Sequence, residues 1–228
     1  MSNNHLEGDA VITETEVKGG SLPLIGDKAP SFEATTTHGT IHLEDYKGSW
    51  LILFSHPADF TPVCTTEFIA FQEIYPQLRE LNTELLGLSI DSVHSHIAWV
   101  RNVKEKFGVK LEFPIIADLN KDVASKFGML MPEGNNTETS RAVFVIDADQ
   151  VVRAIVYYPL STGRNMDEML RLIQALQTSD QHRVATPANW KPGDKVIVPP
   201  PTTQEEAEER SKDDTIECID WYMCKKNI

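Results

Sequence analysis

The segment at residues 49–67, SWLILFSHPADFTPVCTTE, restricts the possible folds more than any other part of the chain. Residues 50–54 form an unbroken apolar run that is too short to span a membrane and suits a strand covered on both faces. Pro57 ends this strand, Thr61 is a favourable N-cap residue, and Pro62 suits the first helical position, where its missing N–H costs nothing. The segment therefore predicts a buried strand, a polar turn and a helix that begins at Pro62.

Cys64 falls at the third position of this helix. Its sulfur would lie among unpaired backbone N–H groups at the positive end of the helix dipole, which favours the thiolate over the thiol. A single cysteine is more often a small buried apolar residue. Here the sequence neighbours are polar; they are Thr61, Thr65, Thr66 and Glu67. We therefore interpret Cys64 as a reactive residue.

Strand and helix patterns alternate along the chain and predict an α/β fold. Further strands are expected at residues 32–37, 83–90, 113–117, 142–146 and 151–157, the last two as a hairpin. Helices are expected from residue 62 to about residue 81 with a kink or restart at Pro76, after a cap at 91–92 as far as Phe107, and at 121–127 and 166–177. The hairpin makes the central sheet mixed, and a cysteine at a strand-to-helix junction in such a sheet suggests a thioredoxin-like architecture.

Composition divides the chain into three segments. Residues 1–21 are polar and are expected to be a flexible extension. Residues 22–181 carry the alternating pattern and are interpreted as the thioredoxin-like domain. Residues 182–228 are expected to form a C-terminal arm or subdomain, because residues 184–201 are rich in proline and residues 204–214 are charged, with a helical turn or two.

Charge and hydropathy exclude several function classes. The chain has 228 residues and a formal net charge of −13, which argues against nucleic acid or an anionic membrane surface as a partner. No apolar stretch approaches the roughly 18 residues of a spanning helix. The N-terminus has neither the basic start nor the apolar middle of a secretory signal, so we expect the protein in the cytoplasm. Three cysteines in such a chain do not indicate a secreted disulfide framework.

The run HPADFTPVCTTE at residues 56–67 resembles the active-site motif of the peroxiredoxin family: a proline, three residues, a threonine, two residues and a cysteine. The resemblance extends from about residue 30 into the C-terminal region, and it is strongest to the one-cysteine-type branch with its archaeal and bacterial relatives. It implies a thioredoxin-like fold and a thiol-dependent peroxidase that uses no metal, haem or other cofactor.

Peroxide reduction by a thiol needs a thiolate, hydrogen-bond donors for two oxygens, and alignment of the sulfur with the O–O bond. In this interpretation Cys64 is the nucleophile and becomes a sulfenic acid. The hydroxyl of Thr61 can donate to the peroxide, a role compatible with capping the helix. Pro57 shields the pocket from water in addition to ending the strand.

The resemblance assigns further residues to the site. Arg141 resembles the family's active-site arginine, although from the sequence alone it would be a surface residue at the start of a strand. Glu67 lies one turn after Cys64 and could orient Arg141. Arg164 resembles a second arginine near the site. His56 is more often a structural group than a general base in such a setting, and we keep it as a residue that lines the pocket.

Cys218 and Cys224 bear on the fate of the sulfenic acid. The one-cysteine branch typically lacks both, whereas archaeal-type members use a C-terminal pair in which the second cysteine resolves the sulfenic acid, often from a neighbouring subunit. By this analogy Cys224 is the resolving cysteine and Cys218 an auxiliary one. Two structural thiols on a tail are the alternative.

A metal site is not expected from the sequence. Cys218 and Cys224 have five residues between them, and no nearby histidine pair completes a zinc site. His94 and His96 lie two residues apart, so they would point to different sides of a helix.

The leading hypothesis is a peroxidase that reduces hydrogen peroxide and organic hydroperoxides, with a thioredoxin- or glutaredoxin-like protein as electron donor. The resemblance also implies a homo-oligomer, either a dimer or a ring of dimers. A disulfide oxidoreductase is less consistent with the sequence, because it would need a Cys-x-x-Cys motif and position 61 is threonine. A peroxide-responsive sensor or chaperone oligomer with low turnover is the third hypothesis.

Overall fold

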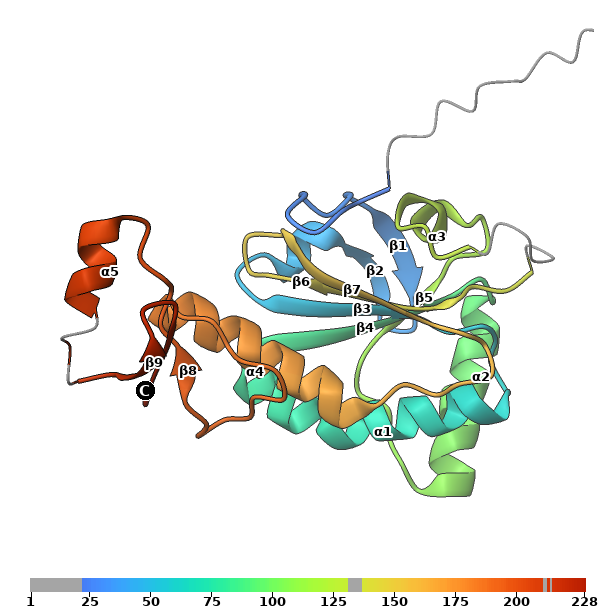
Figure 1. Cartoon of the computed structure of the whole chain (residues 1–228). Coiled ribbons are helices and arrows are strands. Elements are labelled where there is room, and N and C mark those ends of the chain that lie inside the picture. The colour runs from blue at the N-terminus through green and yellow to red at the C-terminus, as the bar shows by residue number, and fades with distance from the viewer. Residues whose placement is uncertain (1–21, 131–136, 211–212, 214) are drawn as a thin grey trace, which may run out of the picture.

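The computed structural model describes residues 22–130, 137–210, 213 and 215–228 (Figure 1). The extension expected at residues 1–21 lies outside the described residues, as do residues 131–136 of a connecting segment. The body contains a mixed sheet with the strand order β2-β1-β5-β4-β3-β6-β7. Its strands are β1 (Glu33–Thr36), β2 (Gly39–His42), β3 (Trp50–Ser55), β4 (Thr83–Ser89), β5 (Ile115–Ala117), β6 (Arg141–Ile146) and β7 (Val152–Tyr158).

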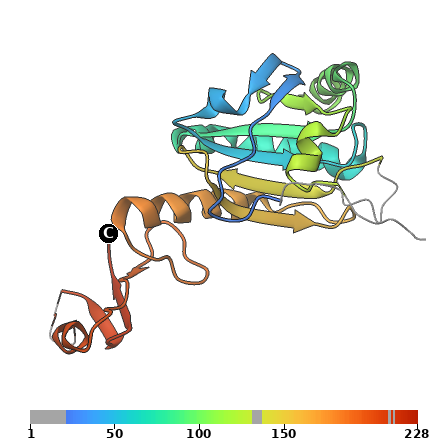
Figure 2. The ribbon, with the colours of Figure 1, turned by 90° about the horizontal axis from the view of Figure 1, so that it is seen from above.

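Helices cover both faces of this sheet (Figures 1 and 2). They are the 3-10 helix η1 (Leu43–Tyr46) and the α-helices α1 (Pro62–Glu80), α2 (Val93–Phe107), α3 (Asp122–Lys126) and α4 (Met166–His182). Helices α1, α2 and α4 lie on one face and α3 on the other (Figure 1). Pro76 does not end α1, so the restart expected there is wrong. Among the described residues, no helix combines the length and apolarity needed to cross a membrane.

Strand β3 is buried on both faces, as its unbroken apolar run predicts. Trp50, Ile52 and Phe54 point into the apolar core beneath α1, α2 and α4. Leu51 and Leu53 alternate with them and point into the second core, on the face that α3 covers. This alternation follows from the two-residue period of a strand, and it fixes the position of the strand end from which the site is built.

The thioredoxin-like mixed sheet expected from the sequence is confirmed. Strand β3 pairs with β4 in parallel and with β6 in antiparallel orientation. The carboxyl ends of β3 and β4 therefore lie at the same edge, where residues 56–61 lead from β3 into α1 (Figure 1). Strand β6 begins at this edge with Arg141, because it runs against β3.

A second, small sheet lies beyond the C-terminal end of α4, away from the body (Figure 2). Its strands have the order β8-β10-β9 and are β8 (Val196–Ile197), β10 (Met223–Lys226) and β9 (Glu217–Asp220); helix α5 (Gln204–Arg210) precedes β9. Sequence analysis predicted an arm here but none of its strands. A small apolar cluster joins this region to α4 and consists of Ala175, Val184, Trp190 and Val196. The domain boundary near residue 181 stays a prediction.

Candidate active site

Helix α1 begins as the sequence predicts. Thr61 is the N-cap, Pro62 occupies the first helical position, and Cys64 follows at the third. The Thr61 side chain makes no capping hydrogen bond, contrary to expectation. Its hydroxyl instead donates to the Ala58 carbonyl at 2.9 Å, which closes the turn that precedes the helix.

Cys64 is fully buried, with 0% of its surface exposed, in the apolar core beneath the sheet. The polar neighbours in the sequence do not make its surroundings open, because their hydroxyls bond to the backbone. Thr65 donates to the Thr61 carbonyl at 2.8 Å, and Thr66 donates to the Val63 carbonyl at 2.7 Å. Cys64 is therefore buried although its neighbours in the sequence are polar.

Arg141 supplies the charged group that contacts the sulfur. Its Nη1 donates to Cys64 Sγ at 3.4 Å and to Glu67 Oε2 at 2.6 Å, and its Nε donates to the Leu160 carbonyl at 2.9 Å. Arg141 is only 3% exposed, so the surface position that its sequence context suggested is wrong. Glu67 thus contacts Arg141 directly, as the orienting role expected of it requires.

Arg164 holds the same carboxylate from the other side. Its Nε and Nη2 donate to Glu67 Oε1 and Oε2 at 2.8 and 2.7 Å, and its backbone N–H donates to Oε1 at 2.9 Å. Its Nη1 donates to the carbonyls of Ser55 and Ala142, at the ends of β3 and β6. Arg164 thus fixes Glu67, and Glu67 in turn fixes Arg141.

The buried charges of this group leave a positive excess beside the sulfur. Burial alone would raise the pKa of Glu67, but the hydrogen bonds and charge of Arg164, together with the charge of Arg141, hold it below its ordinary value. Burial lowers the pKa of Arg164, and the pairing with Glu67 opposes that shift. Two guanidinium groups and one carboxylate sum to one positive charge, which a thiolate at Cys64 would neutralise.

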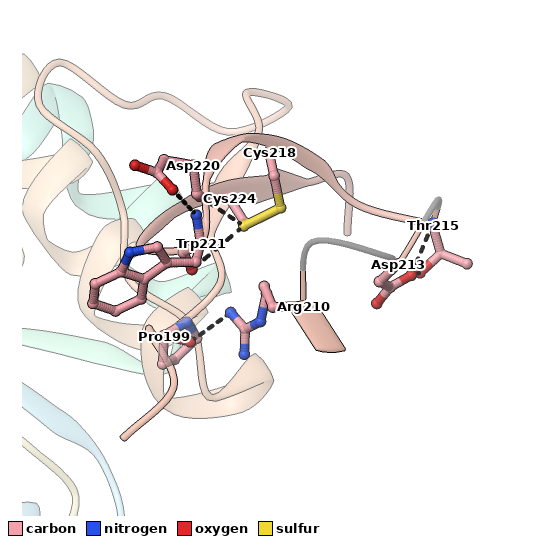
Figure 3. The surroundings of a disulfide bond; sticks show 8 residues. All are labelled: Pro199, Arg210, Asp213, Thr215, Cys218, Asp220, Trp221 and Cys224. Carbon is pink, nitrogen blue, oxygen red and sulfur yellow. Dashed lines mark hydrogen bonds between the residues drawn. A yellow bond between two sulfur atoms is a disulfide. The ribbon is translucent and has the colours of Figure 1, made fainter. Parts of the chain in front are cut away.

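The two C-terminal cysteines are joined to each other. Cys218 and Cys224 form a disulfide across the β9–β10 pair (Figure 3), and Cys64 is a free thiol. Cys224 is buried, whereas Cys218 is partly exposed. The small sheet that carries the disulfide lies at the end of the molecule opposite to the start of α1 (Figure 1). The structure therefore brings the tail cysteines together and keeps both away from Cys64 of the same chain.

Known protein families match two segments of this chain. Residues 25–155 match the AhpC/TSA family, and residues 175–213 match the C-terminal domain of 1-Cys peroxiredoxin. Proteins named peroxiredoxin from Aquifex aeolicus and Methanocaldococcus jannaschii are each 55% identical to this chain over 91% of its length, and the matches cover 98% and 100% of those proteins. The chain belongs to the peroxiredoxin family.

Solved structures of other peroxiredoxins share the fold. The yeast mitochondrial 1-Cys peroxiredoxin has a TM-score of 0.81 and 40% identity, covering 91% of this chain and 100% of that one. A cysteine-to-serine mutant of Peroxiredoxin 6 of Arenicola marina has the same TM-score and 38% identity, covering 90% and 97%. Since peroxiredoxins are thiol peroxidases, this peroxiredoxin is an enzyme of that class.

His56 has a structural environment in this peroxiredoxin. Its ring is fully buried between Phe68 and Trp99, with centroid separations of 4.6 and 5.2 Å. Its Nε2 pairs with Asp59 Oδ1 at 3.0 Å. Pro57, next in the turn, is buried, as its expected shielding role requires.

Sequence analysis did not find two polar residues near this turn, Asp59 and His96. His96 Nδ1 lies 3.0 and 2.9 Å from the two carboxylate oxygens of Asp59. Ligand atoms of His56, Asp59 and His96 all lie within 4.8 Å of one another, a spacing that could hold a metal ion. The signal in the sequence is the i, i+3 spacing of His56 and Asp59 in the turn. His96 has no such local signal, because it lies 37 residues from Asp59 in the sequence.

Proposed function

We propose that Cys64 reduces hydrogen peroxide and organic hydroperoxides. The contact that carries the proposal is the 3.4 Å hydrogen bond from Arg141 Nη1 to Cys64 Sγ, at the N-terminal end of α1. The thiolate sulfur attacks one peroxide oxygen, the O–O bond breaks, and the other oxygen leaves as hydroxide or alkoxide and takes up a proton. The sulfur is oxidised to a sulfenic acid, and the peroxide is reduced to water or an alcohol.

Arg141 and Thr61 are the proposed donors to the two oxygens. Arg141 is held by Glu67 and Arg164, so its guanidinium needs little reorganisation when the leaving oxygen develops negative charge. The single hydroxyl hydrogen of Thr61 is engaged by the Ala58 carbonyl. We expect this hydroxyl to rotate towards the peroxide when it binds.

Cys224 of a neighbouring subunit is proposed to resolve the sulfenic acid. Its thiol displaces water and forms a Cys64–Cys224 disulfide, and the Cys218 thiolate then attacks Cys224 to release the Cys64 thiol. The product of these two steps is the Cys218–Cys224 disulfide of the tail. The distance between the tail and the start of α1 favours resolution within a homo-oligomer, a dimer or a ring of dimers (Figure 1).

A thioredoxin- or glutaredoxin-like dithiol protein is the proposed donor that reduces the tail disulfide. Its thiolate would attack Cys218, because that sulfur belongs to the more exposed of the two residues. We place this cycle in the cytoplasm, where such reductants keep thiols reduced. The net charge of −13 supports partners other than nucleic acid or membranes.

Non-reducing electrophoresis with peptide mapping after one equivalent of hydrogen peroxide tests this cycle. The wild type should yield the Cys218–Cys224 disulfide, and Cys218→Ser should trap Cys64–Cys224 between subunits. Cys64→Ser should consume no peroxide. Full consumption by Cys64→Ser would contradict the peroxidase role of Cys64. Oxidised Cys64 without a cross-link in any variant would make the tail thiols bystanders.

A sensor or chaperone oligomer with low turnover is the second candidate. The observation in its favour is the exposed apolar turn beside the disulfide, where Ile219 is 84% exposed and Trp221 and Tyr222 are also exposed. A surface of this kind would change when the disulfide opens. Two measurements separate the candidates: sedimentation velocity with and without peroxide, and the turnover rate. A change in assembly state together with negligible turnover would support the sensor or chaperone.

A further inference from the structure

A buried polar cluster beside the active-site turn has no part in the chemistry described so far. It consists of His56 and Asp59 in the turn and His96 in the second turn of α2. His96 also reaches the sheet, because its Nε2 lies 3.1 Å from the carbonyl of Ile116 in β5. The cluster therefore links the turn, a helix and a strand.

His96 makes a polar contact through each of its two ring nitrogens. The Ile116 carbonyl can only accept a hydrogen bond, so His96 Nε2 is the donor in the contact with β5. The other nitrogen, Nδ1, lies 2.9 Å from Oδ2 of Asp59, within hydrogen-bond distance. His96 therefore links Asp59 to the central sheet.

His56 contacts Asp59 from within the turn. Its Nε2 donates to Asp59, while its Nδ1 is buried and has no hydrogen-bond partner among the described residues. Burial lowers the pKa of His56, which agrees with a single proton on the ring. Burial alone would raise the pKa of Asp59, but the hydrogen bonds from both histidines hold it well below its ordinary value.

The turn that contains Asp59 is strained. Phe60 follows Asp59 with a φ of 56°, in the left-handed region that a residue with a bulky side chain seldom adopts. The turn is also tied by the Asp59 N–H to Asp91 Oδ2 at 3.1 Å and by the Thr139 hydroxyl to the His56 carbonyl at 2.6 Å. Such a conformation persists only where the surrounding structure fixes it.

We propose that His96 is a positioning residue for the reaction of Cys64: its contact with Asp59 anchors the turn that places Thr61 and the start of α1. The inference rests on the proposed role of Cys64. His96 acts from α2 through Asp59 and does not touch the reacting atoms.

Two variants of His96 separate its two hydrogen bonds. The amide nitrogen of Asn lies near the position of Nδ1, so His96→Asn keeps a donor for Asp59 and loses the one for Ile116. The amide nitrogen of Gln lies near the position of Nε2, so His96→Gln keeps the donor for Ile116 and loses the one for Asp59. His94→Asn, at an exposed position of the same helix, is the matched control.

The rate constant for oxidation of Cys64 by hydrogen peroxide is measured by stopped flow, at a temperature where circular dichroism shows each variant folded. His96→Gln should react about 10-fold more slowly than wild type or worse, because a 1 Å displacement of a reacting group can cost more than this. His96→Asn should stay within about threefold of wild type, since it keeps the anchoring donor. His94→Asn should not change.

Nitrogen-15 NMR of the imidazoles gives a readout that is independent of activity. Wild-type His96 should carry a hydrogen on Nε2, the nitrogen that faces the Ile116 carbonyl. An Nε2 without a hydrogen, or a stoichiometric metal ion found by mass spectrometry and lost in His96→Asn, would overturn the link that His96 makes between Asp59 and the sheet. Equal rate constants in His96→Gln and His96→Asn would overturn the positioning role of His96. If the wild type is active in the same assay, the proposed function of Cys64 is not affected by that result. A wild-type Cys64 that peroxide does not oxidise would overturn both.

Discussion

The two cysteine-bearing regions of this peroxiredoxin are built in opposite ways. Cys64 lies in a large core beneath a seven-stranded sheet, and its charged neighbours are held by contacts that reach across the chain. Cys218 and Cys224 lie in a three-stranded sheet of short strands, joined to α4 by a small apolar cluster. A rigid core suits a reaction in which the reacting atoms must be aligned. A tail with few packing contacts suits a thiol that must move between partners.

The largest effects on activity are expected when the cysteines of the two regions are substituted. Cys64→Ser should reduce peroxide consumption to the uncatalysed rate, because a hydroxyl is a far weaker nucleophile than a thiolate. Cys224→Ser should leave the first turnover unchanged and slow steady-state turnover with a thioredoxin-type donor about 10-fold or more. Stopped-flow and steady-state assays on the same preparations measure both effects. An equal loss of the first turnover in the two variants would show that the tail takes part in the chemical step.

Glu67→Gln tests how much the buried ion pairs beside Cys64 contribute to the stability of the fold. Removing this carboxylate leaves Arg141 and Arg164 buried without their partner, which should lower the free energy of unfolding by about 3–5 kcal/mol. Glu73→Gln, at an exposed position of the same helix, is the matched control and should change it by less than about 0.5 kcal/mol. Denaturant unfolding measures both values.

The pH dependence of the Glu67→Gln effect has a defined sign. The pKa of Glu67 is lower in the folded state than its ordinary value of 4.5, so its ionisation stabilises the fold above that value and this contribution is lost as the pH falls through the lower, folded pKa. The difference in unfolding free energy between wild type and Glu67→Gln should therefore be constant above about pH 5 and shrink below it. A difference that stays constant down to about pH 3 would contradict the ionised state of Glu67.

The start of α1 could be predicted from the sequence because its determinants are local. An apolar run, a proline that ends it and a Thr-Pro pair place Cys64 at the third helical position without reference to the rest of the chain. The roles of Arg141 and Glu67 could be assigned only through the resemblance to a family. Arg141 lies 77 residues from Cys64, and nothing in its local sequence indicates burial.

His96 and the small sheet were missed for related reasons. His96 meets Asp59 across 37 residues, and this contact exists only once α2 packs on the sheet. Strands β9 and β10 have four residues each, half of them charged, and they lack the alternation that marks a half-buried strand. A disulfide joins these two strands, and the sequence does not show which cysteines bond.

Reduction of the tail disulfide should loosen the tail and leave the body intact. The bond closes a loop with a sequence separation of 6, so its loss should cost the small sheet about 2 kcal/mol. Amide hydrogen exchange in β9 and β10 should then speed up by a factor of about 30, while exchange in α1 and β3 should not change. Cys218→Ser/Cys224→Ser is the matched variant without a reductant. Faster exchange in α1 as well would show that the two regions unfold together.

The smallest effect is expected for an exposed ion pair, which can be compared with the buried ion pairs of Glu67. Arg153 of β7 makes two hydrogen bonds to Asp180 near the end of α4, at 2.6 and 2.7 Å, and thus joins the body to the helix that leads into the tail. Both side chains are partly exposed, so Asp180→Asn should lower the free energy of unfolding by only about 0.2–1 kcal/mol. Salt screens exposed charges and leaves buried ones largely unaffected, so this difference should vanish near about 1 M salt while that of Glu67→Gln persists. Denaturant unfolding at low and high salt measures both; a salt-independent effect of Asp180→Asn would show that this contact also belongs to the rigid body.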